Sequence, residues 1–237
     1  MSSKRQPNIF HFKKFSVRHD QVALKVGTDA VLLGAWADVD NAFRILDVGT
    51  GSGIIALMLA QRTSENVSID AVEIEEQDAL QAKENILESP WPKKIVVYHK
   101  AIQEFTSLHK YDLIVCNPPY FENSLLPPST SRAQARHTQR LSADELIEHS
   151  TRLLNHTGKL SVILPTAEGN LFKAKALSRL HLVRETAFFS RKEKPQERWL
   201  LEFSPTSRAI TSNPLVLYSL NDKKTEAYIS LTKDFYL

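Results

Sequence analysis

The four residues Asn117-Pro118-Pro119-Tyr120 offer the most specific chemistry in this sequence of 237 residues. The two prolines fix the local backbone and remove two N–H donors. What remains is a set of acceptors, the Asn117 side-chain carbonyl and main-chain carbonyls, beside the flat ring of Tyr120. An exocyclic amino group could donate both hydrogens to these acceptors, which leaves electron density on its nitrogen, while its ring stacks on the tyrosine. The motif predicts a catalytic site that makes a planar amine or amide nucleophilic without a strong general base.

A second candidate site lies in the glycine-rich segment Asp47-Val-Gly49-Thr50-Gly51-Ser-Gly53. Glycines tolerate positive φ and let a ligand approach the backbone closely, and the helix expected behind them starts with free N–H groups. The dinucleotide-binding fingerprint is G-x-G-x-x-G, whereas the third glycine comes one residue earlier here. Glu73 follows 20 residues after Gly53, at the end of the next apolar run, where a carboxylate can accept hydrogen bonds from a ribose diol. We therefore predict that this turn and Glu73 bind a nucleoside-containing cofactor.

Alternating apolar runs and helical patterns predict the elements that position these residues. We expect strands at 43–49, 68–73, 94–98, 111–116 and 159–164, and helices at 53–62, 76–88, 142–154 and 167–179. This alternation predicts an α/β fold with right-handed βαβ units and a mostly parallel sheet. Runs at 181–189 and 197–204 predict a C-terminal antiparallel hairpin that completes seven strands, before a short strand and a terminal helix. Ligands of open α/β sheets bind outside the carboxyl ends of the strands. Asn117 comes just past the fourth strand, so we expect it to contact the cofactor as well as the amine.

Composition limits the class of protein. The chain is 42% hydrophobic and 24% charged, which excludes a disordered, collagen-like or coiled-coil protein. No apolar run approaches the roughly 20 residues of a membrane span. We expect no signal peptide, because no apolar stretch follows the first five residues. The single cysteine, Cys116, excludes an internal disulfide and a Cys-rich zinc site. We expect a cytoplasmic monomer without a metal and one domain over 1–237, divided into an N-terminal extension with a cofactor-side helix (1–40), a core (41–205) and a C-terminal extension (206–237).

The net charge of +3 averages an acidic segment between two basic ones. Residues 38–88 carry three basic and eleven acidic side chains, whereas residues 1–30 carry six basic and two acidic, and residues 121–200 thirteen basic and eight acidic. This separation predicts one positive surface, suited to nucleic acid. The predicted phosphate-binding residues are Lys4, Arg5, Lys13, Lys14, Arg132, Arg136, His137 and Arg140.

The N-terminal segment carries two further predictions. Phe10-His-Phe-Lys-Lys-Phe15 mixes aromatic and basic side chains, as in surfaces that stack on bases. The alternative is an edge strand with Phe10 and Phe12 on one face and Phe15 on the other. Before the first core strand, Thr28 and Asp29 are expected either to cap a helix or to contact the cofactor side, and Thr28 is the candidate cofactor-binding residue of the two.

Five segments together closely resemble one family over nearly the whole chain. They are 25–36, 45–51, 117–121, Ala135-Arg136-His137-Thr138 and 231–237. The family is that of the bacterial methyltransferases that modify N6 of adenine 37 beside the anticodon of a valine tRNA. The resemblance implies a Rossmann-like class I methyltransferase fold, S-adenosylmethionine as donor, S-adenosylhomocysteine as product, and a tRNA anticodon loop as partner. In one departure, Lys100-Ala101-Ile102-Gln103 stands where relatives hold the cofactor adenine with an acidic or polar residue, which leaves that contact to the backbone or to Gln103.

Other functions remain open at this point. Asn-Pro-Pro-Tyr is shared with protein glutamine N5-methyltransferases and with other RNA or DNA adenine N6-methyltransferases; the glutamine enzymes need less positive charge. The glycine spacing and the lack of residues for hydride transfer argue against an NAD-dependent oxidoreductase. An intact Asn117 and Tyr120 argue against a non-catalytic RNA-binding module.

Overall fold

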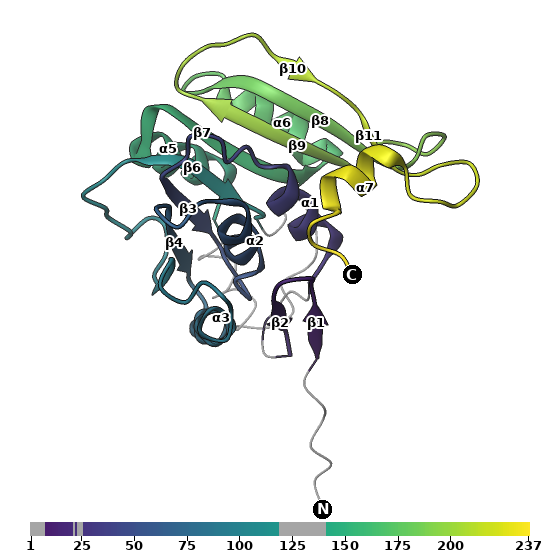
Figure 1. Cartoon of the computed structure of the whole chain (residues 1–237). Coiled ribbons are helices and arrows are strands. Elements are labelled where there is room, and N and C mark those ends of the chain that lie inside the picture. The colour runs from purple at the N-terminus through teal and green to yellow at the C-terminus, as the bar shows by residue number, and fades with distance from the viewer. Residues whose placement is uncertain (1–7, 21, 23–25, 119–140) are drawn as a thin grey trace, which may run out of the picture.

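A twisted β-sheet with helices on both faces organises the chain, as the computed structural model shows (Figure 1). The structure describes residues 8–20, 22, 26–118 and 141–237. Within these residues the main sheet has nine strands in the order β10-β8-β9-β7-β6-β3-β4-β5, with β11 paired to β8. The strands are β3 (Arg44–Val48), β4 (Ser68–Glu73), β5 (Ile95–His99), β6 (Tyr111–Cys116), β7 (Leu154–Pro165), β8 (His181–Arg191), β9 (Arg198–Ser204), β10 (Thr211–Ser212) and β11 (Leu215–Tyr218).

The pairing confirms a mostly parallel sheet with a C-terminal antiparallel hairpin. Strands β5, β4, β3, β6 and β7 are parallel, and β9 runs antiparallel to both β7 and β8. These are the seven predicted strands, and the short β10 and β11 extend the β8 side of the sheet. Strand β7 begins earlier than predicted because Leu154 already pairs with Tyr111, ahead of a register shift.

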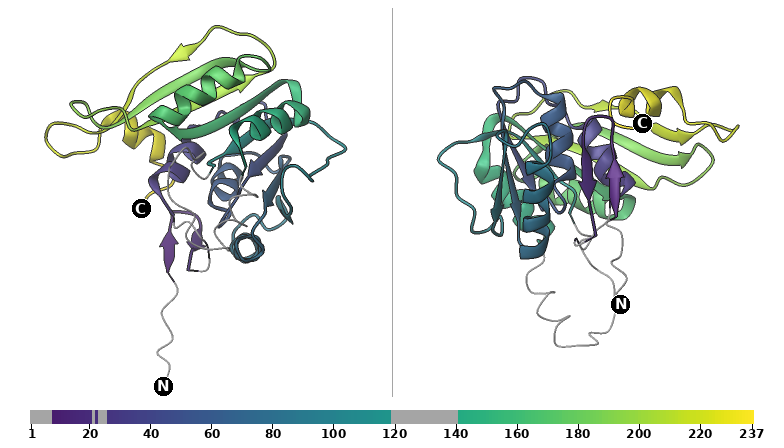
Figure 2. Two further views of the ribbon diagram at one scale, coloured as in Figure 1. Left: turned by 180° about the vertical axis from the view of Figure 1, so that it is seen from behind. Right: turned by 60° about the horizontal axis from the view of Figure 1, so that its bottom comes forward.

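Alternate residues of the central strands supply two hydrophobic cores, one on each face of the sheet. Ile45 belongs to the core that includes residues of α1 and α2, and its neighbour Leu46 to the core that includes residues of α5 and α6. Figure 2 shows α6 in front of the sheet when the molecule is viewed from behind. The helices are α1 (Thr28–Trp36), α2 (Ile54–Arg62), α3 (Glu76–Leu87), α5 (Ala143–Leu153), α6 (Thr166–Ala176) and α7 (Glu226–Thr232). None of the helices in the described residues is long and apolar enough to cross a membrane.

A separate hairpin of β1 (Ile9–His11) and β2 (Ser16–Arg18) precedes the sheet. It contradicts both predictions for Phe12 and Phe15, the stacking on bases and the placement on opposite faces. Phe15 does not lie on the opposite face from Phe12: the turn brings the two rings together at 4.6 Å between centroids. Both rings are buried in the core beside Trp91 and Tyr236, so they cannot stack on bases. Phe10 packs against Phe12 in the same cluster. The physical reason is that the tight turn reverses the chain between the two rings, so the alternation of a single strand does not apply.

The C-terminal tail fixes this hairpin to the rest of the molecule. The Lys13 backbone N–H donates to the Phe235 carbonyl at 2.9 Å, and the Lys13 ammonium donates to the Lys233 carbonyl at 2.6 Å. On the other side, the Gln61 amide of α2 donates to the Asp234 carbonyl at 2.7 Å. The tail therefore connects the hairpin to α2, the helix that follows the glycine-rich turn.

Candidate active site

Three adjacent strands end side by side and bring the predicted residues together. Val48 of β3 is in register with Val72 of β4 and with Cys116 of β6. The residues that follow, Gly49, Glu73 and Asn117, therefore lie at one edge of the sheet. This edge carries the carboxyl ends of the parallel strands, the binding position in open α/β sheets.

The glycine-rich turn adopts a backbone that requires glycine. Gly49, Gly51 and Gly53 have φ values of +68°, +55° and +82°. L-residues with a Cβ atom rarely adopt this left-handed region. A Cβ atom added to Gly49 or Gly51 would meet no heavy atom of the described residues within 4 Å, so no described part of the chain fills the space in front of this part of the turn. The turn can therefore receive a ligand against its backbone.

Asp47 supports the turn from inside the fold. Its side chain is fully buried, and Oδ2 accepts hydrogen bonds from the Thr50 hydroxyl at 2.6 Å and the Ala56 N–H at 3.2 Å. Oδ1 has no hydrogen-bond partner in the described residues. Burial, together with the nearby charge of Glu73, raises the pKa of Asp47 to about 7, although the two hydrogen bonds act in the opposite direction. The structure thus gives Asp47 and the buried Thr50 a bracing position behind the turn.

Glu73 braces the same turn from the neighbouring strand. Its Oε2 accepts a hydrogen bond from the Gly51 N–H at 2.8 Å, and its Oε1 accepts from the Ile74 and Glu75 N–H groups at 2.8 and 3.0 Å. Burial raises the pKa of this carboxyl, and the N–H groups partly oppose that effect. A carboxylate has about four acceptor positions, so three bonds leave capacity for a ligand hydroxyl.

Asn85 of α3 is a site residue that the sequence analysis did not find. It is 1% exposed; its Oδ1 accepts from the Arg18 N–H at 2.9 Å, and its Nδ2 donates to the Arg18 and Ser52 carbonyls at 2.9 and 2.8 Å. Asn85 thereby joins β2 to the glycine-rich turn. The sequence could have indicated it, because Asn85 lies with Ala82 and Ile86 on the apolar side of the helix, where a buried amide needs hydrogen-bond partners.

The start of α1 differs from the prediction. Helix α1 begins at Thr28, so Gly27 is the N-cap, and no side chain makes a capping hydrogen bond there. The prediction that Thr28 or Asp29 caps this helix is therefore wrong. Asp29 instead accepts a hydrogen bond from Arg198 Nε at 2.8 Å. Because Arg198 pairs with Pro165 at the carboxyl end of β7, this ion pair brings the exposed Thr28 to the same edge of the sheet as Asn117.

Asn117 and Pro118 follow β6 directly. Asn117 is half-buried, Pro118 is buried, and the Asn117 side chain makes no hydrogen bond with the part of the chain that the structure describes. Its amide is therefore available to a substrate. Burial raises the pKa of the preceding Cys116 thiol well above its usual value, so this thiol stays protonated and is no nucleophile. Two further predicted catalytic residues, Pro119 and Tyr120, lie outside the described residues.

Gln103 lies beyond the end of β5 and contacts α5. Its Nε2 donates to Glu145 Oε1 at 3.1 Å. Glu145 also accepts from Ser142 N at 2.8 Å in the capping box that starts α5. One N–H of the Gln103 amide is thus engaged by Glu145, and its second N–H and its carbonyl are left to meet a ligand.

Of the predicted phosphate-binding residues, only two can be placed. Lys13 and Lys14 are exposed in the turn between β1 and β2. Predicted phosphate-binding residues outside the described ranges are Lys4, Arg5, Arg132, Arg136, His137 and Arg140. Within the described ranges, no three His, Cys, Asp or Glu side chains gather as a metal site.

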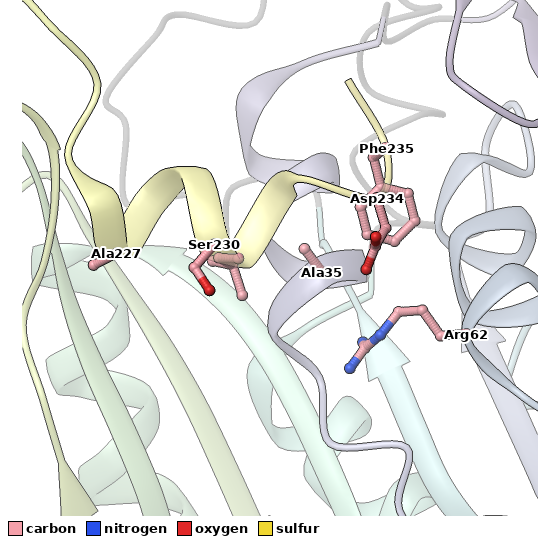
Figure 3. Close-up of a pocket in the computed structure, with 7 residues that line it drawn as sticks. Ala35, Arg62, Ala227, Ser230, Asp234 and Phe235 are labelled. Carbon is pink, nitrogen blue, oxygen red and sulfur yellow. The ribbon is translucent and has the colours of Figure 1, made fainter. Parts of the chain in front are cut away.

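A polar cavity of about 450 Å³ lies at the far end of α2 from the glycine-rich turn (Figure 3). The cavity is lined by Ala35, Arg62, Ala227, Ser230, Leu231, Asp234 and Phe235. Arg62 donates from Nη1 to the Gly34 and Ala37 carbonyls at 2.9 and 2.7 Å and so holds the end of α1. Since α2 spans nine residues, the cavity is about 14 Å from the turn, and it is no part of the strand-end site.

Comparison with known proteins agrees with this geometry. The model of the methyltransferase small domain family matches residues 23–190. The chain is 43% identical over 239 residues to the tRNA1(Val) (adenine(37)-N6)-methyltransferase of Citrobacter koseri, covering 100% of this chain and 98% of that relative. It is 44% identical over 234 residues to the protein of the same name from Trichodesmium erythraeum, covering 97% and 98%.

Solved structures agree on the fold. One from Agrobacterium tumefaciens, described as a predicted O-methyltransferase, has a TM-score of 0.69 at 22% identity, covering 87% of this chain and 96% of that one. A SAM-dependent O-methyltransferase from Thermotoga maritima has a TM-score of 0.56 at 18% identity, covering 78% and 67%. Similarity at such low identity concerns the fold alone.

Proposed function

The chain belongs to the tRNA1(Val) (adenine(37)-N6)-methyltransferase family, and we propose that it transfers a methyl group from S-adenosylmethionine to N6 of adenine 37 in the anticodon loop of a valine tRNA. One observation carries this proposal: the relatives of that name match the chain from end to end at 43–44% identity. The match therefore includes the hairpin and the C-terminal tail, which lie outside residues 23–190 of the general methyltransferase family. The fold is the class I Rossmann-like methyltransferase fold that the sequence predicted.

The strand-end site fits the cofactor. S-adenosylmethionine supplies an electrophilic methyl group on a positively charged sulfur. The backbone of Gly49 and Gly51 would hold its methionine end, since no described part of the chain fills the space in front of either glycine. Glu73 would accept hydrogen bonds from the ribose diol with its remaining capacity. We assign the cofactor adenine to the Gln103 side-chain amide or to backbone groups nearby, and we propose that Thr28 lies at the border of the same site.

Asn117 prepares the amine for attack. Its side-chain carbonyl accepts one hydrogen of the N6 amino group, and a main-chain carbonyl of the Asn-Pro-Pro segment accepts the other. Both bonds favour an sp³-like nitrogen whose lone pair is free of the ring and aimed at the methyl carbon. The methylated nitrogen loses its proton readily, so no strong base is required. In this proposal Pro118 and Pro119 fix the backbone, and Tyr120 stacks on the target base.

The family also determines the partner. The substrate is tRNA, which Lys13, Lys14 and the predicted basic residues of the loop after Asn117 would bind through phosphates. We propose that residues 1–237 form one domain, since the two cores cover opposite faces of a single sheet. We further propose that the protein acts as a monomer in the cytoplasm.

Nucleoside mass spectrometry tests the function. We expect the purified protein with S-adenosylmethionine to form N6-methyladenosine in total tRNA, at position 37 of a valine tRNA. Labelling of protein alone, with labelled cofactor and a mixture of tRNA and release factors, would instead identify a glutamine methyltransferase.

A variant tests the catalytic role of Asn117. Asn117→Ala should lower kcat about 10²- to 10³-fold, as loss of a hydrogen bond made in the transition state does. Its affinity for S-adenosylhomocysteine, measured by calorimetry, should stay within about twofold of wild type, because the glycine-rich turn and Glu73 are intact. An unchanged kcat would show that the Asn117 amide does not act on the amine.

A further inference from the structure

Two loops project together from the β8 side of the sheet. One joins β8 to β9 and the other joins β11 to α7 (Figure 1). Tyr218 at the end of β11 is in register with Arg191 at the end of β8, and the Arg191 guanidinium lies 5.6 Å from the Tyr218 ring centroid. Arg191 also forms an ion pair with Asp222 of the second loop. The contact of Arg191 with the Tyr218 ring and its ion pair with Asp222 therefore hold the two loops against each other.

These loops carry a cluster of positive charge. Residues 191–194 and 222–224 contain five basic and two acidic side chains. We call the five basic residues the basic rim: Arg191, Lys192, Lys194, Lys223 and Lys224. Of the two acids, Asp222 is paired with Arg191. Lys192, Lys194 and Lys223 are exposed and form no ion pair with the described part of the chain, so their charge is available to a partner.

The basic rim faces the same edge of the sheet as the active site. Strand β7 ends at Pro165, which pairs with Arg198 at the start of the antiparallel β9. The β8–β9 turn therefore lies at the carboxyl edge, where Asn117 follows β6. In the strand order, β8 is three positions from β6 and β11 is four, which is a sideways offset of roughly 14 to 19 Å at about 4.8 Å per strand. Through β7 and β9, Cys116 is level with Glu185, so Arg191 also lies roughly 16 Å further along the strand direction than Asn117. The strand ends that carry the rim are therefore roughly 22 to 25 Å from Asn117.

This offset decides which part of an RNA the rim can reach. It exceeds the size of one nucleotide, so rim lysines cannot contact a base that is bound at Asn117. It spans several nucleotides, so the rim lysines can reach phosphates of the helix next to the loop. Lysine ammonium groups act as point charges on phosphates and read no base.

We propose that the basic rim binds the phosphate backbone of the helical stem adjoining the methylated loop. The proposal rests on the proposed function, because it requires an RNA substrate with its target base at Asn117. It assigns the β8–β9 turn and the loop before α7 to substrate binding, in addition to the N-terminal and loop residues predicted from sequence. The rim would orient the stem so that the loop enters the active site.

The test compares two double variants of equal charge change. K192E/K194E reverses two rim charges, and K83E/K93E reverses two exposed lysines, one on α3 and one at the opposite edge of the sheet before β5. Binding is measured against a stem-loop RNA with the anticodon arm sequence and against its unpaired loop alone, at several salt concentrations. Circular dichroism and S-adenosylhomocysteine affinity verify that both variants are folded.

For K192E/K194E, we expect affinity for the stem-loop to fall at least tenfold. The slope of log K against log salt concentration should become shallower by about 1 to 2, because each phosphate contact contributes about 0.9 to that slope. Affinity for the loop alone should stay within twofold, and K83E/K93E should resemble wild type with both RNAs. Equal losses with the stem-loop and the loop alone, or no loss beyond that of K83E/K93E, would overturn the proposal. A wild-type protein that forms no N6-methyladenosine in any RNA would overturn the proposed function itself, which is a separate result.

Discussion

Asn85 offers the sharpest test of how the fold supports the site. Asn85→Ala removes three hydrogen bonds and leaves the Ser52 carbonyl without its partner in a buried position. A buried group left unpaired costs about 1–3 kcal/mol, and each of the two bonds to the partly buried Arg18 backbone contributes about 1 kcal/mol. We expect the free energy of unfolding to fall by about 3–5 kcal/mol, a large part of the roughly 5–15 kcal/mol of a typical domain.

The assay is urea unfolding followed by circular dichroism, together with calorimetric titration of S-adenosylhomocysteine. We expect cofactor affinity to fall about tenfold, because the turn that contains Ser52 loses its link to α3. Asn85→Asp keeps the shape of the side chain but removes both N–H donors and adds a buried charge, so it should be at least as destabilising as Asn85→Ala.

The control for both variants is Leu87→Ala, in the same helix. The Leu87 side chain is 74% exposed, and its truncation should change stability by less than about 0.5 kcal/mol. If Asn85→Ala unfolds within about 1 kcal/mol of wild type and binds the cofactor product equally well, the inference that Asn85 positions the turn is wrong.

Two further predictions concern the turn itself. Gly51→Ala should cost about 1–2 kcal/mol of stability in urea unfolding, because φ is +55° and the new Cβ atom meets no neighbour among the described residues. The variant should also bind S-adenosylhomocysteine more weakly, and an unchanged stability would show that the turn relaxes. Asp47→Asn tests the raised Asp47 pKa of about 7. Between about pH 4 and 7 the native protein keeps a proton on this carboxyl, whereas the unfolded chain releases it. The unfolding free energy of wild type should therefore fall as the pH rises through this range. The asparagine variant lacks this carboxyl, so its unfolding free energy minus that of wild type should rise from pH 4 to pH 7; a difference independent of pH would contradict the assignment.

Local patterns were sufficient for the parallel core and for two parts of the site. The apolar runs of β3, β4 and β6 and the helical periods between them are properties of neighbouring residues, so they could be predicted without any knowledge of contacts. The glycines at 49, 51 and 53 were predictable for the same reason, since positive φ is a requirement of the single residue. Asn117 could be placed because a strand end and two prolines fix its position.

Local patterns failed where a turn or a distant partner decides the outcome. Alternation along one strand separated Phe12 from Phe15, whereas the hairpin turn stacks them. The residue types of Thr28 and Asp29 favoured helix capping, but Asp29 pairs with Arg198, which is 169 residues away in the sequence.

The order of residues alone was therefore sufficient to predict the type of fold, the glycine turn and the chemistry of Asn-Pro-Pro-Tyr, because each depends on backbone preferences and spacing within a few residues. The folded chain was needed to show that Asn85 joins the hairpin to the turn and that the loops after β8 and β11 lie at the active-site edge of the sheet. These contacts depend on the register between strands and helices, which is set by packing of both cores over the whole chain. No segment of the sequence contains that information alone.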